Sequence, residues 1–407
     1  MKVLLSSLGS RGDVQPLLAL ALELRMIGHE PRVCVAPNFK EWAESFGFEC
    51  TPIGPDVRKL TGGTTSQMPP PRPSAEQRYQ LAAQAVRAQF PVLTEAARGC
   101  DVIVGAGALQ IASRSVAEAL RLPYLFAAYC PAVLPSADHP PPKIGMHYPQ
   151  SLPASANLAL WAEEEQRWND LFGATLNEER SRLGLAPVAS VLRHILTDQP
   201  WLAADPVLAP PGAATDVPAV ARGAWLLPDK SPLPEPLAQF LASGEPPVYL
   251  GFGSMRAAPQ SSQVLIEAAR ALGLRSVVSQ GWGNLAPIDA GADCLAIGEV
   301  AHDQLFPRVA AVVHHGGAGT TTAAARAGKA QVVVPHLYDQ YYWAHRVQTL
   351  GAGTSGPASD SLTVDRMVSA LSECLHPEVT TRAQGLAGRI ELYGARLAAR
   401  HIDSQYG

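Results

Sequence analysis

The stretch that decides the fold is HHGGAGTT, residues 314–321. It follows the apolar run VAAVV at 309–313 and precedes the alanine-rich segment 323–325. This order indicates a buried strand, a glycine loop and the start of a helix. Unpaired backbone N–H groups at a helix start, together with the helix dipole, favour an anion such as a diphosphate. The stretch therefore points to a ligand that carries a nucleotide.

Short apolar runs alternate with helix-period segments along most of the chain. Strands are predicted near 3–5, 32–35, 102–104 and 124–126, with helices near 14–26 and 113–120. The alternation restarts with VYL at 248–250, which leads into the turn GFGS at 251–254. Such alternation is typical of βαβ units in a doubly wound parallel sheet. The predicted fold class is α/β, with two Rossmann-like domains whose glycine turns face each other across one cleft.

The length supports this division, because 407 residues exceed what one hydrophobic core normally serves. We expect an N-terminal domain at 1–208, a linker at 209–222 and a C-terminal domain at 223–385. A closing helix at 386–407 is expected to pack back on the N-terminal domain. Apolar residues near helical spacing predict one long helix from about 379 to 402, packed across the domain junction.

Two proline-rich insertions, 62–73 and 131–142, interrupt the N-terminal domain. Their proline triplets, at 69–71 and 140–142, exclude regular helix or strand. Loops of this length are often binding loops or lids. The sequence leaves open whether they are functional loops or disordered surface.

Composition argues against several classes of protein. Basic residues are scattered and the formal net charge is −4, whereas a nucleic-acid binder normally has a basic face. The six cysteines form no Cys-x-x-Cys pair, so reduced thiols in a cytoplasm are expected instead of a metal cluster or a disulfide framework. The N-terminus is interpreted as a first strand, and no window suggests a signal peptide or a membrane span. We expect a cytoplasmic protein that is a monomer or a weak oligomer.

Six motifs carry a resemblance that covers nearly the whole chain. They are GSRGD at 9–13, GFGSM at 251–255, GW at 281–282, GEV at 298–300, HHGGAGTT at 314–321 and DQ at 339–340. Together they resemble the family 1 glycosyltransferases of the GT-B fold, and most closely the actinobacterial glycosyltransferases of vancomycin-type glycopeptides. The resemblance implies transfer of a sugar from a nucleoside diphosphate donor to an acceptor hydroxyl, with inversion and without a metal. It is weakest in the proline-rich insertions.

The resemblance makes Asp13 the general base that takes the proton of the acceptor hydroxyl. The local sequence alone is also compatible with a helix N-cap, because Asp13 precedes a helix with Pro16 in its first turn. Capping would favour the ionised carboxylate, whereas burial would favour the neutral acid. The sequence leaves open which effect prevails.

The other residues of the matching motifs are expected to bind the donor. His315 and the loop N–H groups would hold the diphosphate, where charge develops in the transition state. Trp282 and Val300 would flank the base, and Asp339 with Gln340 would hold sugar hydroxyls. The strand-end turns would reach the sugar or diphosphate. The expected donor-binding set is Ser10, Arg11, Gly12, Ser254, Trp282, Val300, His315, Gly317, Ala318, Gly319, Thr320, Asp339 and Gln340.

Each of these residues also has a structural interpretation. A lone histidine at a strand end is commonly a satisfied core residue, and Asp339 with Gln340 could be ordinary polar loop residues. Trp282 and Val300 could belong to the core. A plain salt bridge would explain Arg11 equally well.

The motifs name neither the sugar nor the acceptor. A dTDP-deoxysugar or UDP-glucose is the expected donor and a glycopeptide scaffold the expected acceptor, with macrolide or polyketide, sterol and lipid acceptors as alternatives. Other classes are a sugar-nucleotide epimerase, a non-catalytic auxiliary partner and a nicotinamide-linked oxidoreductase. The last would use GAG at 105–107, but Gln110 stands where its fingerprint needs a third glycine. A non-catalytic role is disfavoured because the chain has Asp13, His315 and Asp339 at the motif positions.

Overall fold

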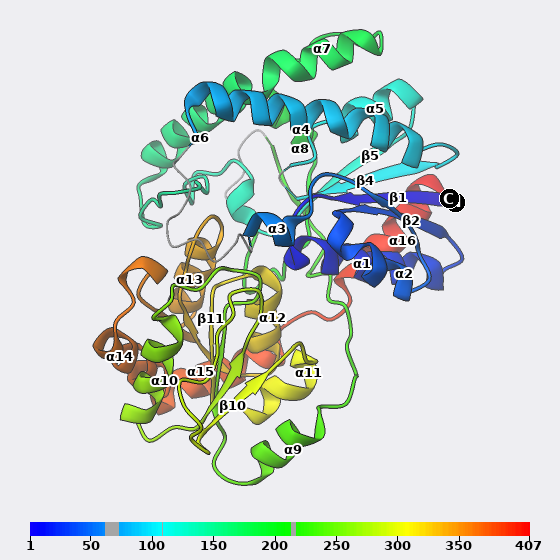
Figure 1. The fold of residues 1–407 in the computed structure, drawn as a ribbon. Helices are drawn as coiled ribbons and strands as arrows, with labels where there is room; N and C mark the ends of the chain where they lie inside the picture. Colours follow the sequence, from blue (N-terminus) through cyan, green and yellow to red (C-terminus); the bar gives the residue numbers. More distant parts are fainter. Residues whose placement is uncertain (62–72, 108, 213–216) are drawn as a thin grey trace.

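The chain forms two parallel sheets, one above the other in Figure 1. The computed structural model describes residues 1–61, 73–107, 109–212 and 217–407. The N-terminal sheet has the order β3-β2-β1-β4-β5-β6-β7 and the C-terminal sheet the order β10-β9-β8-β11-β12-β13. The strand pairs are parallel in both sheets. The predicted α/β class with two Rossmann-like domains is confirmed.

The N-terminal sheet is buried on both faces, as expected for a parallel sheet covered by helices. Its inner strand β1 (Lys2–Ser7) is buried from Val3 to Ser7. The other strands are β2 (Glu30–Val35), β3 (Glu49–Pro52), β4 (Val102–Ala106), β5 (Tyr124–Ala128), β6 (Trp201–Leu202) and β7 (Val220–Ala221). The helices are α1 (Arg11–Met26), α2 (Lys40–Ser45), α3 (Val57–Thr61), α4 (Ala75–Ala96), α5 (Ser113–Leu120), α6 (Ala154–Trp168), α7 (Ala174–Arg182) and α8 (Val191–Leu196).

The C-terminal sheet repeats this plan around β11, which carries the glycine loop. The strands are β8 (Val248–Gly251), β9 (Ser276–Ser279), β10 (Cys294–Ile297), β11 (Ala311–His314), β12 (Ala330–Val333) and β13 (Gly353–Ser355). The helices are α9 (Glu235–Ala242), α10 (Ser261–Ala271), α11 (His302–Leu305), α12 (Ala318–Arg326), α13 (Gln340–Thr349), α14 (Val364–Cys374) and α15 (Pro377–Ala387).

The C-terminal tail differs from the prediction of one long helix over 379–402, which is wrong. The chain forms α15 and then α16 (Gly394–Tyr406), with residues 388–393 between them. Ala383 on α15 is buried in the C-terminal core, whereas Ala398 on α16 is buried in the N-terminal core. In Figure 1, α16 lies beside α1. The tail therefore crosses from one domain to the other through a non-helical segment, because each half of it packs on a different core.

The structure describes the two proline-rich insertions and the predicted linker to different extents. Residues 62–72 of the first insertion lie outside the described residues. The second begins with the 3₁₀ turn η2 (Pro131–Val133), and residues 134–142 form neither helix nor strand, as their prolines predict. Strand β7 lies within the predicted linker 209–222, of which 213–216 are outside the described residues. The N-terminal sheet thus gains an edge strand that the proline-rich sequence around it does not predict.

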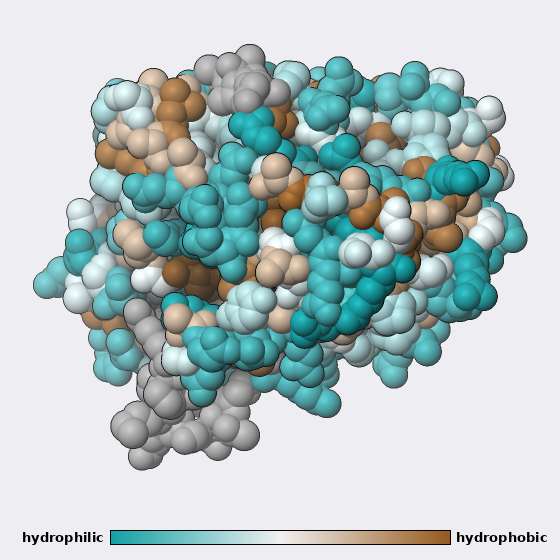
Figure 2. Space-filling view, turned by 90° about the horizontal axis from the view of Figure 1, so that it is seen from above, coloured by the Kyte–Doolittle hydropathy of each residue, from teal (hydrophilic) through white to brown (hydrophobic). Residues whose placement is uncertain are grey.

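The upper face of the molecule mixes polar and apolar side chains, as Figure 2 shows. Among the described residues, no helix is both long enough and apolar enough to span a bilayer.

The junction between α16 and the segment after β7 gives a stability prediction. A Cβ atom at Gly394 would overlap the backbone of Gly223 and Ala224, whereas a Cβ atom at Gly385 in α15 would meet open space. We expect G394A to lower the free energy of unfolding by about 1–3 kcal/mol through overpacking. G385A should raise it by up to about 1 kcal/mol through helix propensity. Urea denaturation of both variants measures the difference, and equal effects would contradict the packing described here.

Candidate active site

The carboxyl ends of the strands in both sheets meet at the junction between the domains. Arg11, just after β1, forms an ion pair with Glu299, just after β10. Phe39, after β2, stacks on Trp282, after β9, with ring centroids 5.9 Å apart. Ligands of open parallel sheets normally bind outside such strand ends. The structure therefore brings together the two halves of the site that the sequence predicts.

Asp13 is fixed by the first turn of α1. Ser10 is the N-cap, and its N–H donates to Oδ2 of Asp13 at 2.8 Å. The Ser10 hydroxyl lies 3.3 Å from the same oxygen. The alternative of Asp13 as the N-cap is wrong, because α1 begins at Arg11 and places Asp13 at its third position, in a capping box.

Two glycines border the Asp13 carboxylate. A Cβ atom at Gly9 would overlap the carboxylate, and one at Gly107 would lie 3.3 Å from Oδ1. Gly107 also has a φ of +83°, which side chains rarely adopt. Sequence reasoning missed Gly107 as a site residue, because GAG at 105–107 was considered only as a dinucleotide motif. Its place at the end of β4, next to β1, was the available signal.

Burial prevails over capping at Asp13 and raises its pKa to about 6, although the hydrogen bonds from Ser10 lower it. Burial also raises the pKa of Asp339 to about 7. The Trp343 indole N–H lowers the Asp339 pKa by donating to Oδ2 at 3.1 Å, while the charge of Asp13 raises it. Two carboxyl groups, one from each domain, thus interact electrostatically at the junction.

The two histidines of the glycine loop have different environments. His314 is a satisfied core residue: its Nδ1 accepts from the Gly316 N–H at 3.1 Å and its Nε2 lies 2.9 Å from the Gln331 side-chain oxygen. His315 is 9% exposed, and its Nδ1 has no hydrogen-bond partner among the described residues. Burial lowers the pKa of His315 well below its usual value. His315 is therefore a neutral imidazole with a free nitrogen.

The loop beside His315 ends in a helix start. Gly317 is the N-cap of α12, so Ala318, Gly319 and Thr320 supply its first N–H groups. A Cβ atom at Gly317 would lie 2.6 Å from Nε2 of His315. Gly319 is exposed, and a Cβ atom there would meet open space. Small residues thus leave the helix start open to an anion, with the buried His315 ring directly beside it.

Arg11 occupies a structural salt bridge in this arrangement. Besides its pairing with Glu299, its guanidinium lies 4.4 Å over the Trp42 ring. The ion pair with Glu299 balances the charge of Arg11, and the Trp42 ring covers one face of its guanidinium. Neither Glu299 nor Trp42 was identified from the sequence as a partner of Arg11, and Glu299 lies 288 positions away along the chain.

The remaining predicted residues lie around the same junction with different local roles. Trp282 has one ring face covered by Phe39, and Val300 packs beside the β10 core. The Gln340 side-chain oxygen accepts from the N–H groups of His336 at 2.8 Å and Leu337 at 3.1 Å, so it shapes the loop before α13. Ser254 is half-buried in the turn after β8, and Gly12 is exposed in the first turn of α1.

Metal-binding groups do not gather in the part of the chain that the structure describes. No cluster of three or more His, Cys, Asp or Glu side chains there could hold a metal ion. All six cysteines are unpaired.

Comparison with known proteins agrees with this architecture. The sequence models for the glycosyltransferase family 28 N-terminal domain and the erythromycin biosynthesis protein CIII-like C-terminal domain match residues 3–137 and 293–389. Vancomycin aglycone glucosyltransferase of Amycolatopsis orientalis is 45% identical over 98% of this chain and 96% of its own length. The dTDP-epi-vancosaminyltransferase of the same organism is 39% identical over 94% and 92%.

Solved structures share the fold at low sequence identity. The glycosyltransferase of kitacinnamycin superposes with a TM-score of 0.73 at 20% identity, over 100% of this chain and 99% of that one. The glycosyltransferase VinC in complex with dTDP gives 0.68 at 21% identity, over 98% and 100%.

The fold and the sequence relatives define a glycosyltransferase of the GT-B class, an enzyme type that uses a nucleotide-sugar donor. The chain belongs to the family 1 antibiotic glycosyltransferases, in the group that contains the vancomycin-type enzymes. The resemblance and the enzyme class predicted from the sequence are confirmed.

The raised carboxyl pKa values predict how stability depends on pH. Because the Asp13 pKa rises from 3.8 to about 6 on folding, the folded protein binds more protons than the unfolded chain in this window. The free energy of unfolding should therefore fall as pH rises from 4 to 6, by an amount on the order of 2 kcal/mol from Asp13. D13N should make this decrease of the unfolding free energy with pH smaller, which urea denaturation at several pH values measures. An unchanged slope would show that Asp13 does not titrate as described.

Proposed function

We propose that the protein is an inverting glycosyltransferase that moves a sugar from a nucleoside diphosphate to a hydroxyl of a glycopeptide antibiotic scaffold. The observation that carries the proposal is that α1, with Asp13 in its first turn, contacts α12 of the other domain, whose start follows His315. The 45% identical relative named for the vancomycin aglycone supports a glycopeptide acceptor. In this proposal the N-terminal domain, 1–208, binds the acceptor and the C-terminal domain, 223–385, binds the donor.

Asp13 acts as the general base in this mechanism. The acceptor oxygen attacks the anomeric carbon and passes its proton to the Asp13 carboxylate. The bond from that carbon to the β-phosphate oxygen breaks on the opposite face, and the electron pair leaves with the diphosphate. A pKa of about 6 supports this role, since such a carboxylate is a stronger base than an exposed one and is still ionised near pH 7.

The diphosphate would be held by the α12 start and His315 without a metal. Backbone N–H groups of Ala318, Gly319 and Thr320 are fixed donors, which stabilise the leaving charge without reorganisation. The His315 ring borders the same helix start, because a Cβ atom at Gly317 would lie 2.6 Å from its Nε2, and this position supports a hydrogen bond from the imidazole to a phosphate oxygen. Because the imidazole is neutral, it contributes a hydrogen bond and not a full charge.

The rest of the donor would lie along the strand ends of the C-terminal sheet. Asp339 would bind sugar hydroxyls, while Gln340 supports that loop through its backbone bonds. Trp282 and Val300 would contact the base, and Ser10, Gly12 and Ser254 would border the sugar or diphosphate. A relative named for a dTDP-sugar supports dTDP as the nucleotide, with UDP-glucose as the second candidate. Family membership also supports a cytoplasmic enzyme, and we propose that it works as a monomer or weak oligomer.

D13N should reduce transfer by at least about a hundredfold, in line with removal of a general base. Its affinity for dTDP should stay near that of the wild type, because Asp13 does not touch the nucleotide in this proposal. Sugar transfer from dTDP-glucose and UDP-glucose to vancomycin aglycone, followed by mass spectrometry, measures the effect. D365N, an exposed acidic residue in the first turn of α14, is the matched control. Full activity in D13N would overturn the assignment of the base.

H315A should weaken both the binding of dTDP and the rate of transfer. One lost hydrogen bond to an anion is expected to cost about 1.5–3 kcal/mol, which is roughly tenfold or more in affinity. Calorimetric titration with dTDP measures this, and H314A is unsuitable as a control because His314 supports the core. H345A, at a half-buried position of α13, serves instead. Unchanged dTDP affinity in H315A would contradict its phosphate role.

A thermal-shift panel of nucleoside diphosphates and nucleotide sugars tests the reaction class directly. A ligand that binds the folded state raises the melting temperature, and the increase grows with the logarithm of the ratio of ligand concentration to Kd. Stabilisation by dTDP or UDP compounds, followed by transfer to the aglycone, is the expected result. Interconversion of the free sugar nucleotide without acceptor would favour an epimerase, and binding without turnover would favour an auxiliary partner.

A further inference from the structure

An aromatic contact joins the N-terminal domain to a loop that would contact the nucleotide base. Phe39 ends the 3₁₀ turn η1 (Pro37–Phe39), which follows β2. Its ring stacks on Trp282 of the other domain, with 5.9 Å between centroids and 21° between the ring planes. Phe39 is 5% exposed, while Trp282 is half-buried and packs against the N-terminal core. The domain that would bind the acceptor therefore holds the indole that would contact the base.

A second contact from the same part of the N-terminal domain reaches the other base loop. The rings of Trp42 on α2 and Phe39 have centroids 6.1 Å apart, and the Arg11 guanidinium lies 4.4 Å over the Trp42 ring. Arg11 forms its ion pair with Glu299, directly before Val300. Phe39, Trp42 and Arg11 form one group, the interdomain cluster. This cluster contacts both loops that would flank the base.

The two interdomain contacts of this cluster differ in strength. The side chains of Arg11 and Glu299 are 39% and 68% exposed, and such exposed ion pairs contribute little and weaken in salt. The stack of Phe39 on Trp282 involves a buried ring, and aromatic pairs contribute more than the area they bury. The Phe39 ring is therefore the main contact by which the cluster holds the donor domain.

The loop that carries Trp282 is tied in turn to the diphosphate side of the site. The Trp282 N–H donates to the Gly253 carbonyl oxygen at 2.8 Å. A Cβ atom at Gly281 would overlap the same carbonyl, and a Cβ atom at Gly253 would lie 3.0 Å from Cε1 of His315. Trp282 and His315 thus contact the same turn after β8. A displacement of Trp282 would therefore disturb the base end and the diphosphate end of the proposed nucleotide site.

We propose that Phe39 is a donor-positioning residue supplied by the acceptor domain, and that it acts by holding the Trp282 ring in place for the nucleotide base. The inference rests on the base contact proposed for Trp282 above. It deepens that function, because nucleotide affinity then depends on contact between the domains although Phe39 itself does not touch the nucleotide. Donor recognition is shared between the domains and is not confined to the C-terminal half.

F39L tests this role, because leucine retains apolar contact with the core but cannot stack on an indole. We expect F39L to raise the Kd for dTDP about three- to tenfold, the size of an aromatic pair, in a calorimetric titration. The KM for the nucleotide sugar should rise with it, while the KM for vancomycin aglycone stays near that of the wild type. F39Y, which keeps the ring, should bind dTDP as tightly as the wild type.

F46L is the matched control for loss of an aromatic ring. The Phe46 ring packs against Trp42 and Phe48, which both belong to the N-terminal domain. F46L should therefore leave the Kd for dTDP unchanged. A rise in Kd as large as that of F39L would overturn the assignment to the ring that stacks on Trp282.

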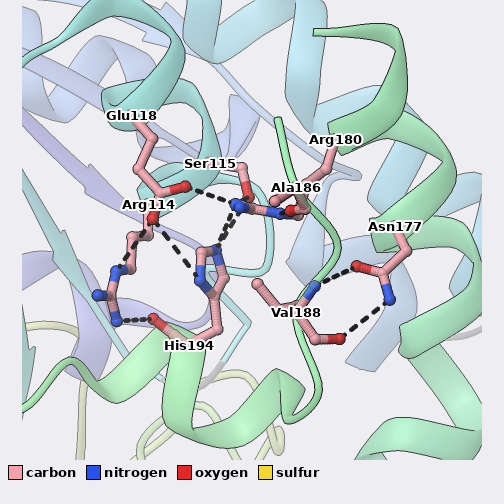
Figure 3. A network of polar contacts seen from close by, with 8 residues as sticks. All are labelled: Arg114, Ser115, Glu118, Asn177, Arg180, Ala186, Val188 and His194. Carbon is pink, nitrogen blue, oxygen red and sulfur yellow. Dashed lines mark hydrogen bonds and ion pairs between the residues drawn. The ribbon is translucent and has the colours of Figure 1, made fainter. Parts of the chain in front are cut away.

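A buried network in the N-terminal domain provides a control for lost stability. Ser115 on α5 lies 2.9 Å from Nε2 of His194 on α8 and accepts a hydrogen bond from Arg180 on α7 at 3.0 Å, as Figure 3 shows. S115A should lower the melting temperature, because it leaves buried partners unpaired, without changing the Kd for dTDP. A Kd that rises as much in S115A as in F39L would indicate a general loss of stability and overturn the positioning role.

The double variant F39L/W282A shows whether Phe39 acts through Trp282. F39L should weaken dTDP binding no further in a protein that already lacks the indole. An equal loss in both backgrounds, or wild-type or tighter affinity in F39L beside a weakened W282A, would overturn the role of Phe39 alone. W282A with wild-type affinity would instead contradict the base contact in the proposed function, and this inference with it.

Discussion

The position of the Asp13 carboxylate is the constraint on which the proposed chemistry depends. Gly9 and Gly107 border it so closely that a side chain at Gly9 would overlap it, and Ser10 binds one of its oxygens at 2.8 Å. The surrounding protein opposes ionisation more strongly than Ser10 favours it, which gives the raised pKa. Local geometry thus fixes where the proton goes, and burial fixes how strongly it is held.

The rest of the site follows from two parallel sheets whose strand ends meet. This arrangement places a carboxyl group on one side of the junction and a helix start with a neutral histidine on the other. The Arg11 to Glu299 ion pair and the stacked rings of Phe39 and Trp282 hold the sides together. Residues 388–393 connect the domains covalently, and α16 packs the end of the chain on α1. Contact between the domains is therefore part of the site itself.

Much of this was predictable from the sequence, because apolar periodicity and glycine turns are local signals. The predictable features include the strand before HHGGAGTT, the fold class and the enzyme family. The break between α15 and α16 was not predictable, since its apolar spacing continues while the partner core changes. Nor could the sequence distinguish His314, whose ring nitrogens are both paired, from His315, whose Nδ1 has no partner among the described residues, or find Gly107. Those properties depend on neighbours distant in the sequence.

The most direct test of the account is a crystal structure of the protein with dTDP. The account predicts the β-phosphate at the start of α12, with oxygens in hydrogen-bond distance of the Gly319 or Thr320 N–H and of the His315 ring. The Asp13 carboxylate should face the same space from the other domain. A nucleotide bound away from α12, or a β-phosphate without contact to His315, would contradict the split site described here.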